Sequence, residues 1–183
     1  MLRTGSMQRR AAALGIAAIA LAACSQTPPP RWAEGGAPLE IPRAHWERLG
    51  GAIDLLEDGR IFVQGVHRLS IDAAGRVFEP DGEPVAVLQP DGFLIGPDER
   101  AMGRIGMANA SPPGRGTAWL SIGPQGEVVR YADDGERLAD GIWTGCGRAL
   151  RACTLVTHLV GLEEVRRRPR VSVGIGIGVG FGR

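Results

Sequence analysis

Residues 53–144 repeat one pattern that restricts the folds available to the chain: a tight turn rich in Gly, Asp and Pro, then a short apolar or alternating run. Asp-Gly turns supply the positive φ angles that hairpins require, and the β-branched residues between them favour strands. The pattern predicts a mainly β domain, an antiparallel meander of about eight to ten strands arranged as a sandwich or a partly closed barrel. The predicted turns lie at 57–59, 72–75, 80–82, 90–92, 123–126 and 133–135.

Two segments depart from this pattern. Residues 109–116 (NASPPGRG) predict a loop between two groups of strands. Before the meander, residues 42–49 are compatible with two turns of helix, because Pro is tolerated in a first turn and a Gly pair follows. Trp46 and Leu49 would then share the inner face of that helix.

After residue 146 the apolar residues recur at steps of three and four. This period predicts one late amphipathic helix, over about residues 148–167, packed across the sheet. Its arginine-rich last turn complements the helix dipole, and Pro169 cannot continue the helix. His158 falls among the apolar positions, so we expect a buried, hydrogen-bonded side chain.

The segment 171–181 alternates strictly between large apolar residues and Ser or Gly. Each Gly would cost about 1 kcal/mol in a helix interior, so a C-terminal Gly-rich strand is preferred. We expect this strand to complete the domain's own sheet. Contact with an envelope partner, self-association and membrane insertion are the alternatives. The apolar face that would make such contacts consists of Val171, Val173, Ile175, Ile177, Val179 and Phe181.

The first 23 residues have the features of an export signal. Three arginines precede an apolar run from Ala11 to Ala23, and no acidic residue occurs in this segment. In a helix, these thirteen residues reach only about 20 Å, short of the ~30 Å hydrocarbon core of a bilayer. The segment therefore predicts a signal peptide, residues 1–23, rather than a membrane-spanning helix.

Residues 21–24 (Leu-Ala-Ala-Cys) resemble the lipobox of bacterial lipoproteins, which has a Leu, two small residues and an obligatory Cys. The resemblance implies cleavage before Cys24, a diacylglyceryl group on its thiol and an acylated amino terminus. Two or more acyl chains, at ~0.8 kcal/mol per buried methylene, anchor a protein firmly. In this family an Asp after the Cys favours retention in the inner membrane, so Ser25 favours the outer membrane.

The mature chain divides into a tether and one domain. Residues 24–40 are rich in Pro and Gly, which predicts a tether between the lipid and the body of the protein. Residues 41–183 are long enough for a single domain with a substantial core.

Cys146 and Cys153 remain once Cys24 carries lipid. In an oxidising compartment two remaining cysteines usually pair. Seven residues apart on one straight helix, their Cα atoms would be about 10 Å apart, beyond the ~7 Å limit for a disulfide. A disulfide therefore requires Cys146 to lie outside the helix that contains Cys153; two buried thiols are the alternative.

Charge and motif content give no sign of several function classes. Removal of residues 1–23 takes away three Arg and leaves 18 basic and 20 acidic residues, so no nucleic-acid partner is expected. His45, His67 and His158 form no zinc-binding pair at helical spacing, and no Gly-x-Ser-x-Gly motif occurs. We predict no catalytic residues, no metal site and no cofactor.

Three functions are compatible with these features. The first is a non-enzymatic envelope protein, structural or partner-binding, held on a membrane by lipid on Cys24. The second is a carrier of an apolar small molecule. Strands followed by a helix and a last strand are similar to the lipocalins, although Gly141-Ile142-Trp143, which resembles their Gly-x-Trp motif, comes late in the chain. The third is an envelope hydrolase.

Three structural outcomes would separate these functions. A closed barrel with an apolar cavity of about 300 Å³ or more would favour the carrier. A solid core with an open, unpaired edge on the strand 171–181 would favour partner binding. A buried carboxylate facing a His in a cleft would favour the enzyme.

Overall fold

In the computed structural model, which describes residues 27–167, twelve antiparallel strands form one closed barrel and an α-helix follows them. Consecutive strands pair with each other, and β1 pairs with β12 to close the ring. The mainly β meander with a late helix is confirmed, with more strands than expected. The strands are β1 (Ala44–Glu47), β2 (Ile53–Leu55), β3 (Arg60–Val63), β4 (Val66–Ile71), β5 (Arg76–Phe78), β6 (Pro84–Leu88), β7 (Phe93–Ile95), β8 (Ala101–Ile105), β9 (Asn109–Ser111), β10 (Leu120–Ile122), β11 (Glu127–Tyr131) and β12 (Arg137–Thr144).

The six predicted turns each connect two consecutive strands. Gly59 illustrates why these turns need glycine. Its φ is +86°, and a Cβ at this position would lie 1.8 Å from the carbonyl oxygen of Ile71. Only glycine can adopt that φ without strain while its Cα lies so close to the Ile71 carbonyl oxygen. A glycine in such a turn therefore marks the boundary between two strands.

Two local predictions are wrong. Residues 42–49 do not form a helix, because Ala44–Glu47 is β1, with Ala44 and Trp46 buried and His45 and Glu47 exposed. This alternation is the period of a strand, and pairing with both β2 and β12 gives it hydrogen bonds that a two-turn helix would lack. Within the predicted loop 109–116, the first three residues form β9, paired with β8 and β10.

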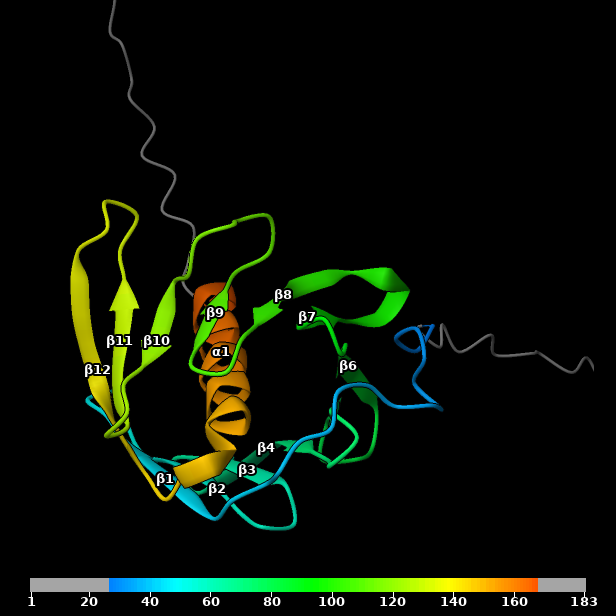
Figure 1. The fold of residues 1–183 in the computed structure, drawn as a ribbon. Coiled ribbons are helices and arrows are strands. Elements are labelled where there is room, and N and C mark those ends of the chain that lie inside the picture. Colours follow the sequence, from blue (N-terminus) through cyan, green and yellow to red (C-terminus); the bar gives the residue numbers. More distant parts are fainter. Residues whose placement is uncertain (1–26, 168–183) are drawn as a thin grey trace, which may run out of the picture.

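The helix α1 (Leu150–Arg167) runs through the middle of the barrel, so the sheet that it packs against surrounds it (Figure 1). Residues 152–161 are all buried, so this part of the helix is enclosed on every side rather than amphipathic. A barrel of more than eight strands has a lumen wider than its own side chains fill. Here α1 fills that lumen, and the core consists of inward-facing strand residues packed around it.

Part of the predicted tether 24–40 belongs to the domain. Gly36 and Ala37 donate backbone hydrogen bonds of 2.7 and 2.6 Å to the β4–β5 turn and to the end of β6. Ala37 is fully buried, and Trp32 packs edge-on against Phe78. Backbone hydrogen bonds of this kind need no large side chain, so the Pro- and Gly-rich composition of this segment does not predict them.

Cys24 and the predicted strand 171–181 lie outside the described residues. Because β1 and β12 pair directly, the described barrel closes without a further strand. Within residues 27–167 no helix is both long enough and apolar enough to span a bilayer.

Candidate functional site

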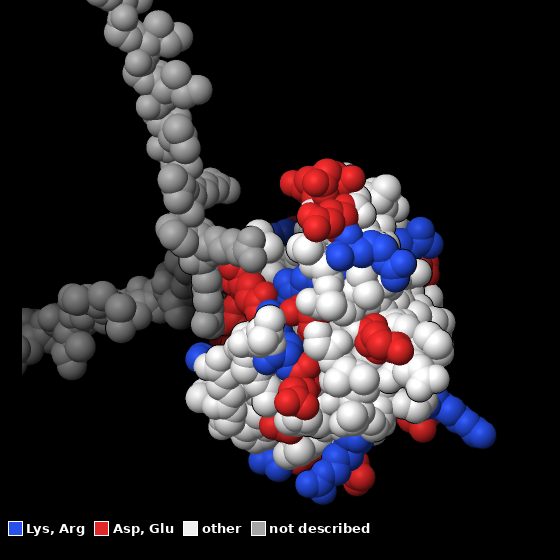
Figure 2. Space-filling view, turned by 90° about the vertical axis from the view of Figure 1, so that its left-hand side faces the viewer, with Lys and Arg blue, Asp and Glu red and all other residues white. Residues whose placement is uncertain are grey.

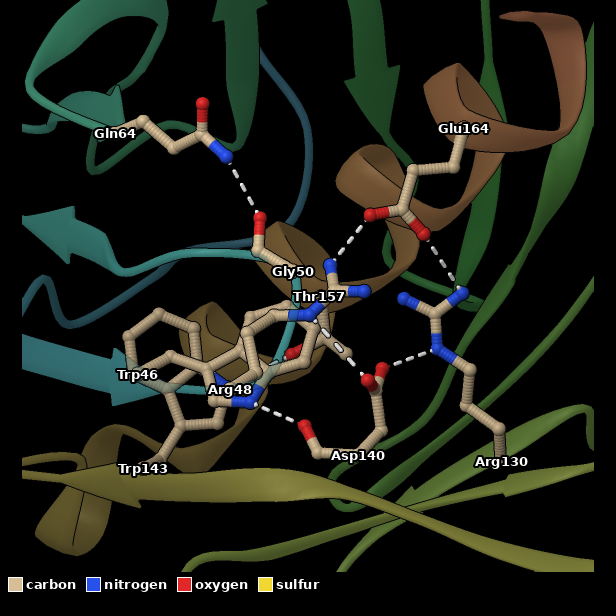
Figure 3. Close-up of polar contacts among 9 residues, drawn as sticks. All are labelled: Trp46, Arg48, Gly50, Gln64, Arg130, Asp140, Trp143, Thr157 and Glu164. Carbon is tan, nitrogen blue, oxygen red and sulfur yellow. Dashed lines mark hydrogen bonds and ion pairs between the residues drawn. The ribbon is translucent and has the colours of Figure 1, made fainter. Parts of the chain in front are cut away.

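Four charged side chains form a ring of ion pairs at the end of the barrel where α1 ends (Figure 3). Arg48 follows β1, Arg130 lies on β11, Asp140 on β12 and Glu164 on α1. Arg48 lies 2.5 Å from Glu164 and 3.3 Å from Asp140. Arg130 lies 3.1 Å from Glu164 and forms its other ion pair with Asp140. We call these four residues the charged ring.

The charged ring holds α1 in place rather than presenting a binding surface. Its Arg48 side chain is only 10% exposed. Burial alone would raise the pKa of Glu164, but hydrogen bonding to Arg48 and the charge of Arg130 outweigh burial and hold this pKa below its usual value. Two cations and two carboxylates compensate one another, so the ring leaves no net charge for a ligand.

Two tryptophans lie beside the charged ring and join it to the core. The Trp46 and Trp143 rings stack with centroids 5.6 Å apart, and the Arg48 guanidinium lies over the Trp46 ring. Trp46 Nε1 donates a hydrogen bond of 2.8 Å to the backbone oxygen of Asp140. Both indoles are buried, so this packing fixes β1 against β12 at the point where the barrel closes.

His158 lies on α1, fully buried between the helix and the barrel wall. Trp119 Nε1 donates a 3.0 Å hydrogen bond to His158 Nδ1, and His158 Nε2 donates a 2.8 Å hydrogen bond to the Met102 carbonyl oxygen. Burial lowers the pKa of His158 to about 4. Both ring nitrogens are occupied and the ring is neutral at neutral pH, so the expectation of a buried, hydrogen-bonded histidine is confirmed.

Gly103 on β8 makes room for this histidine. A Cβ at Gly103 would lie 2.6 Å from His158 Nε2 and 2.4 Å from the Ser111 carbonyl oxygen, and the φ of Gly103 is +130°. Any side chain at this position would push His158 off its acceptor. The sequence signal for this contact is a lone Gly inside a strand.

A second histidine forms a pair on the outside of the barrel. His45 Nδ1 lies 2.7 Å from Asp54 Oδ1, and these residues are directly opposite on β1 and β2. Their side chains are 46% and 44% exposed. Thr144, opposite His45 on β12, donates its hydroxyl to the His45 backbone oxygen rather than to the imidazole. The pair is therefore half exposed, and the Thr144 hydroxyl does not contact its imidazole.

Of the grooves that border α1, two lie near its opposite ends. A larger one, of about 530 Å³, is lined by the β6–β7 and β8–β9 turns and by Arg151 near the start of the helix. A smaller one, of about 210 Å³, lies near the other end of the helix, and its mixed lining includes apolar residues such as Leu69 and Leu159 beside charged ones such as Arg68 and Glu163. Glu79 also lines this smaller groove, and burial, together with the charges of Asp81 and Glu163, raises the pKa of Glu79.

Cys146 and Cys153 lie at disulfide-bonding distance, with their sulfur atoms 2.02 Å apart and their Cα atoms 6.2 Å apart. Cys153 is in the first turns of α1. Cys146 lies outside that helix, before the 3₁₀ turn Gly147–Ala149, which is the geometry that the spacing demands. The other predicted site residues, Cys24 and the apolar face of 171–181, are outside the described residues.

Sequence reasoning missed the charged ring, the His45–Asp54 pair and both grooves. The members of the ring come from positions 48 to 164, and nothing in the local sequence connects them. Residues 27–167 hold no group of three or more His, Cys, Asp or Glu side chains that could bind a metal ion.

Comparison with known proteins gives no relative on which to base a function. No protein-family model, curated protein or solved structure matches the chain. The function must therefore be inferred from the N-terminal sequence and from the described barrel alone.

Proposed function

We propose that the chain is a lipid-anchored protein of the bacterial cell envelope with a non-enzymatic structural or partner-binding role. The filled barrel is the observation that supports this role best. Because α1 occupies the interior over residues 152–161, the surfaces available to another molecule are the outer wall and the two ends. The lipobox-like residues 21–24 support anchoring through Cys24, and Ser25 favours the outer membrane.

The N-terminal contacts favour an anchor near one end of the barrel. The backbone N–H of Asp98, in the β7–β8 turn, donates to the carbonyl oxygen of Thr27 over 3.4 Å. Cys24 is three residues before Thr27, a span of at most about 10 Å. The body of the protein would therefore lie close to the bilayer, not at the end of a long tether.

The composition of the outer wall fits partner contact better than nucleic-acid contact. On the face shown in Figure 2, acidic and basic side chains are interspersed over a mostly uncharged surface. Phe93 and Ile142 are large apolar side chains exposed on the strands β7 and β12. An aromatic side chain such as that of Phe93 is of a type enriched in the buried core of protein interfaces.

Fractionation of cells tests the anchor. Cys24→Ala should move the protein from the membrane fraction to the soluble or unprocessed pool, whereas Cys146→Ala should leave the processed chain on the membrane. Ser25→Asp should shift it from the outer to the inner membrane. Processing and membrane association that are both unchanged by Cys24→Ala would refute the anchor.

Photocrosslinking in cells tests the partner-binding role. A photoreactive amino acid at Phe93 or at Ile142 should crosslink to an envelope protein, and one at the buried Leu155 should not. If neither exposed position crosslinks above the level of Leu155, partner binding through this wall is wrong.

The smaller groove supports a second candidate, a carrier of an apolar small molecule. Its floor includes Met102, Leu159 and Leu162, and its volume of about 210 Å³ would hold only a small ligand. An apolar fluorescent probe such as N-phenyl-1-naphthylamine should then bind, and Leu162→Gln should weaken binding. Equal fluorescence with both proteins would exclude this role for the groove.

A further inference from the structure

We propose that the larger groove binds a phosphate group, held mainly by Arg151 and Arg104. The groove lies against the first turn of α1 and the wall formed by β8 and β9, and its volume of about 530 Å³ is within the range of small-molecule sites. Such a site is independent of the lipid anchor, because it depends on charges that the fold leaves uncompensated.

Arg151 is the first of these charges. Its Nε atom is buried without a hydrogen-bond partner, and it forms no salt bridge with any carboxylate of residues 27–167. Arg48 and Arg130 also bury a nitrogen without a hydrogen bond, but the carboxylates of the charged ring meet their charges. Among these three arginines, Arg151 alone lacks a counter-ion in the described chain.

The position of Arg151 on α1 adds to the local positive potential. Arg151 is the second residue of the helix, and the first turn carries no acidic side chain. The amino end of a helix is the positive end of its dipole, where anions are stabilised and cations are not. The positive charge of Arg151 is therefore electrostatically unfavourable when the groove holds no ligand, and a bound anion would compensate this charge.

Arg104 supplies a second cation to the same groove. It lies on β8, its guanidinium packs over the Phe93 ring at 5.4 Å, and it forms no salt bridge within residues 27–167. Its Nη2 makes only a long contact of 3.4 Å to the Asp91 backbone oxygen. Two arginines with free donors suit an oxyanion, which each can bind through two parallel hydrogen bonds.

The remaining lining agrees with a polar, anionic ligand. Asn109 and Ser111 add an amide and a hydroxyl to the wall. The one carboxylate of the lining, Asp91, accepts the backbone N–H of Phe93 over 3.1 Å and so is engaged within its own turn. Two cations against one carboxylate leave the groove with a net positive charge.

The groove lies at the barrel end away from the residues nearest Cys24. In a meander the turns alternate between the two ends, so the β6–β7 and β8–β9 turns of the groove are opposite the β7–β8 turn that contacts Thr27. If the proposed anchor is correct, the groove faces away from the protein's own bilayer. This orientation favours a free phosphate compound over a headgroup of that bilayer.

Calorimetric titration of the full-length protein in detergent tests the site, with inorganic phosphate and dihexanoyl phosphatidic acid as probes and dihexanoyl phosphatidylcholine as the neutral-headgroup control. We expect Arg151→Gln and Arg104→Gln each to weaken phosphate binding at least tenfold. Arg100→Gln, an exposed arginine at the opposite end, removes the same charge and should have no effect. Arg151→Lys should retain part of the affinity.

The outcomes separate the sources of phosphate. Binding of inorganic phosphate that depends on Arg151 supports a free ligand, and Arg151-dependent binding of phosphatidic acid alone supports a lipid headgroup in the same site. No binding of either probe to the folded protein, or equal loss in Arg100→Gln and Arg151→Gln, would overturn the proposal. Circular dichroism confirms that each variant is folded, and Arg151→Gln should unfold at the same or a higher Tm without phosphate.

Discussion

Trp143 Nε1 donates a 2.8 Å hydrogen bond to the hydroxyl of Thr157, and both groups are buried where β12 faces α1. The same hydroxyl donates to the Cys153 carbonyl oxygen over 2.8 Å, so it both accepts and donates a hydrogen bond inside the protein. This contact explains how a helix with polar residues can lie inside a barrel. The fully buried polar residues of α1, Thr154, Thr157 and His158, each have a partner on the wall or on the helix itself.

Thr157→Val should destabilise the protein by about 1–3 kcal/mol, because it leaves the Trp143 N–H buried without an acceptor. Thr117 is exposed, so Thr117→Val makes the same chemical change outside the core and should alter stability by less than about 0.5 kcal/mol. Urea unfolding at neutral pH measures both. Equal stability of the two variants would mean that α1 is not enclosed as described.

The stability of the protein should fall in mild acid because of His158. Its pKa is about 4 in the folded protein and about 6.5 when exposed, so the unfolded chain binds a proton that the folded chain refuses. The free energy of unfolding is therefore unaffected by the titration of His158 above about pH 6.5, and it decreases as the pH falls from 6.5 toward 4. Between pH 7 and pH 5 we expect a loss of about 2 kcal/mol.

His158→Gln isolates this effect. Urea unfolding at pH 7 and pH 5 should show a smaller pH dependence for His158→Gln than for the original protein, whereas His67→Gln should retain the full dependence. If all three proteins lose the same stability between these pH values, His158 is not the buried neutral group described.

Glu164→Gln should destabilise the protein by about 1–2 kcal/mol, because it leaves two arginines of the charged ring with one carboxylate. Glu47 is exposed on β1, and Glu47→Gln is the matched control with the same loss of charge. Thermal unfolding compares them, and identical Tm values would show that the ring does not hold α1. Hydrogen exchange should localise the loss to the last turns of the helix.

Loss of the cysteine pair should also weaken the start of α1. Closing the eight-residue loop from Cys146 to Cys153 contributes roughly 2.5 kcal/mol in the chain-entropy model. A double Cys→Ala variant should lose about that much, and the original protein should lose a similar amount with reductant. Alkylation of the unfolded protein before reduction should label neither Cys146 nor Cys153; labelling of both would establish buried thiols instead.

Local sequence signals predicted the turns and the late helix because both depend on neighbouring residues. Gly59 and its equivalents mark turns by their positive φ, and the three- and four-residue steps from Ala149 to Val160 mark a helix. The cysteine spacing also constrained the geometry, since a seven-residue separation allows a disulfide only with Cys146 outside α1.

Closure of the barrel and the position of α1 inside it depend on distant contacts, which the sequence does not display. Thr154 and Thr157 are polar and interrupt the apolar pattern of the helix, yet both are fully buried, as is His158. Their partners include Met107, Trp143 and Trp119, between 14 and 47 residues away. The charged ring and the groove around Arg151 could not be predicted for the same reason, because their residues are far apart in the sequence.

Mass spectrometry of the amino terminus, on protein extracted from native membranes, tests the proposed lipid anchor most directly. We predict a mature chain that begins at Cys24 and carries a diacylglyceryl group on its thiol, with an acyl chain on its amino group. An amino-terminal peptide that is unmodified, or that begins at another residue, would contradict the anchor and with it the envelope function.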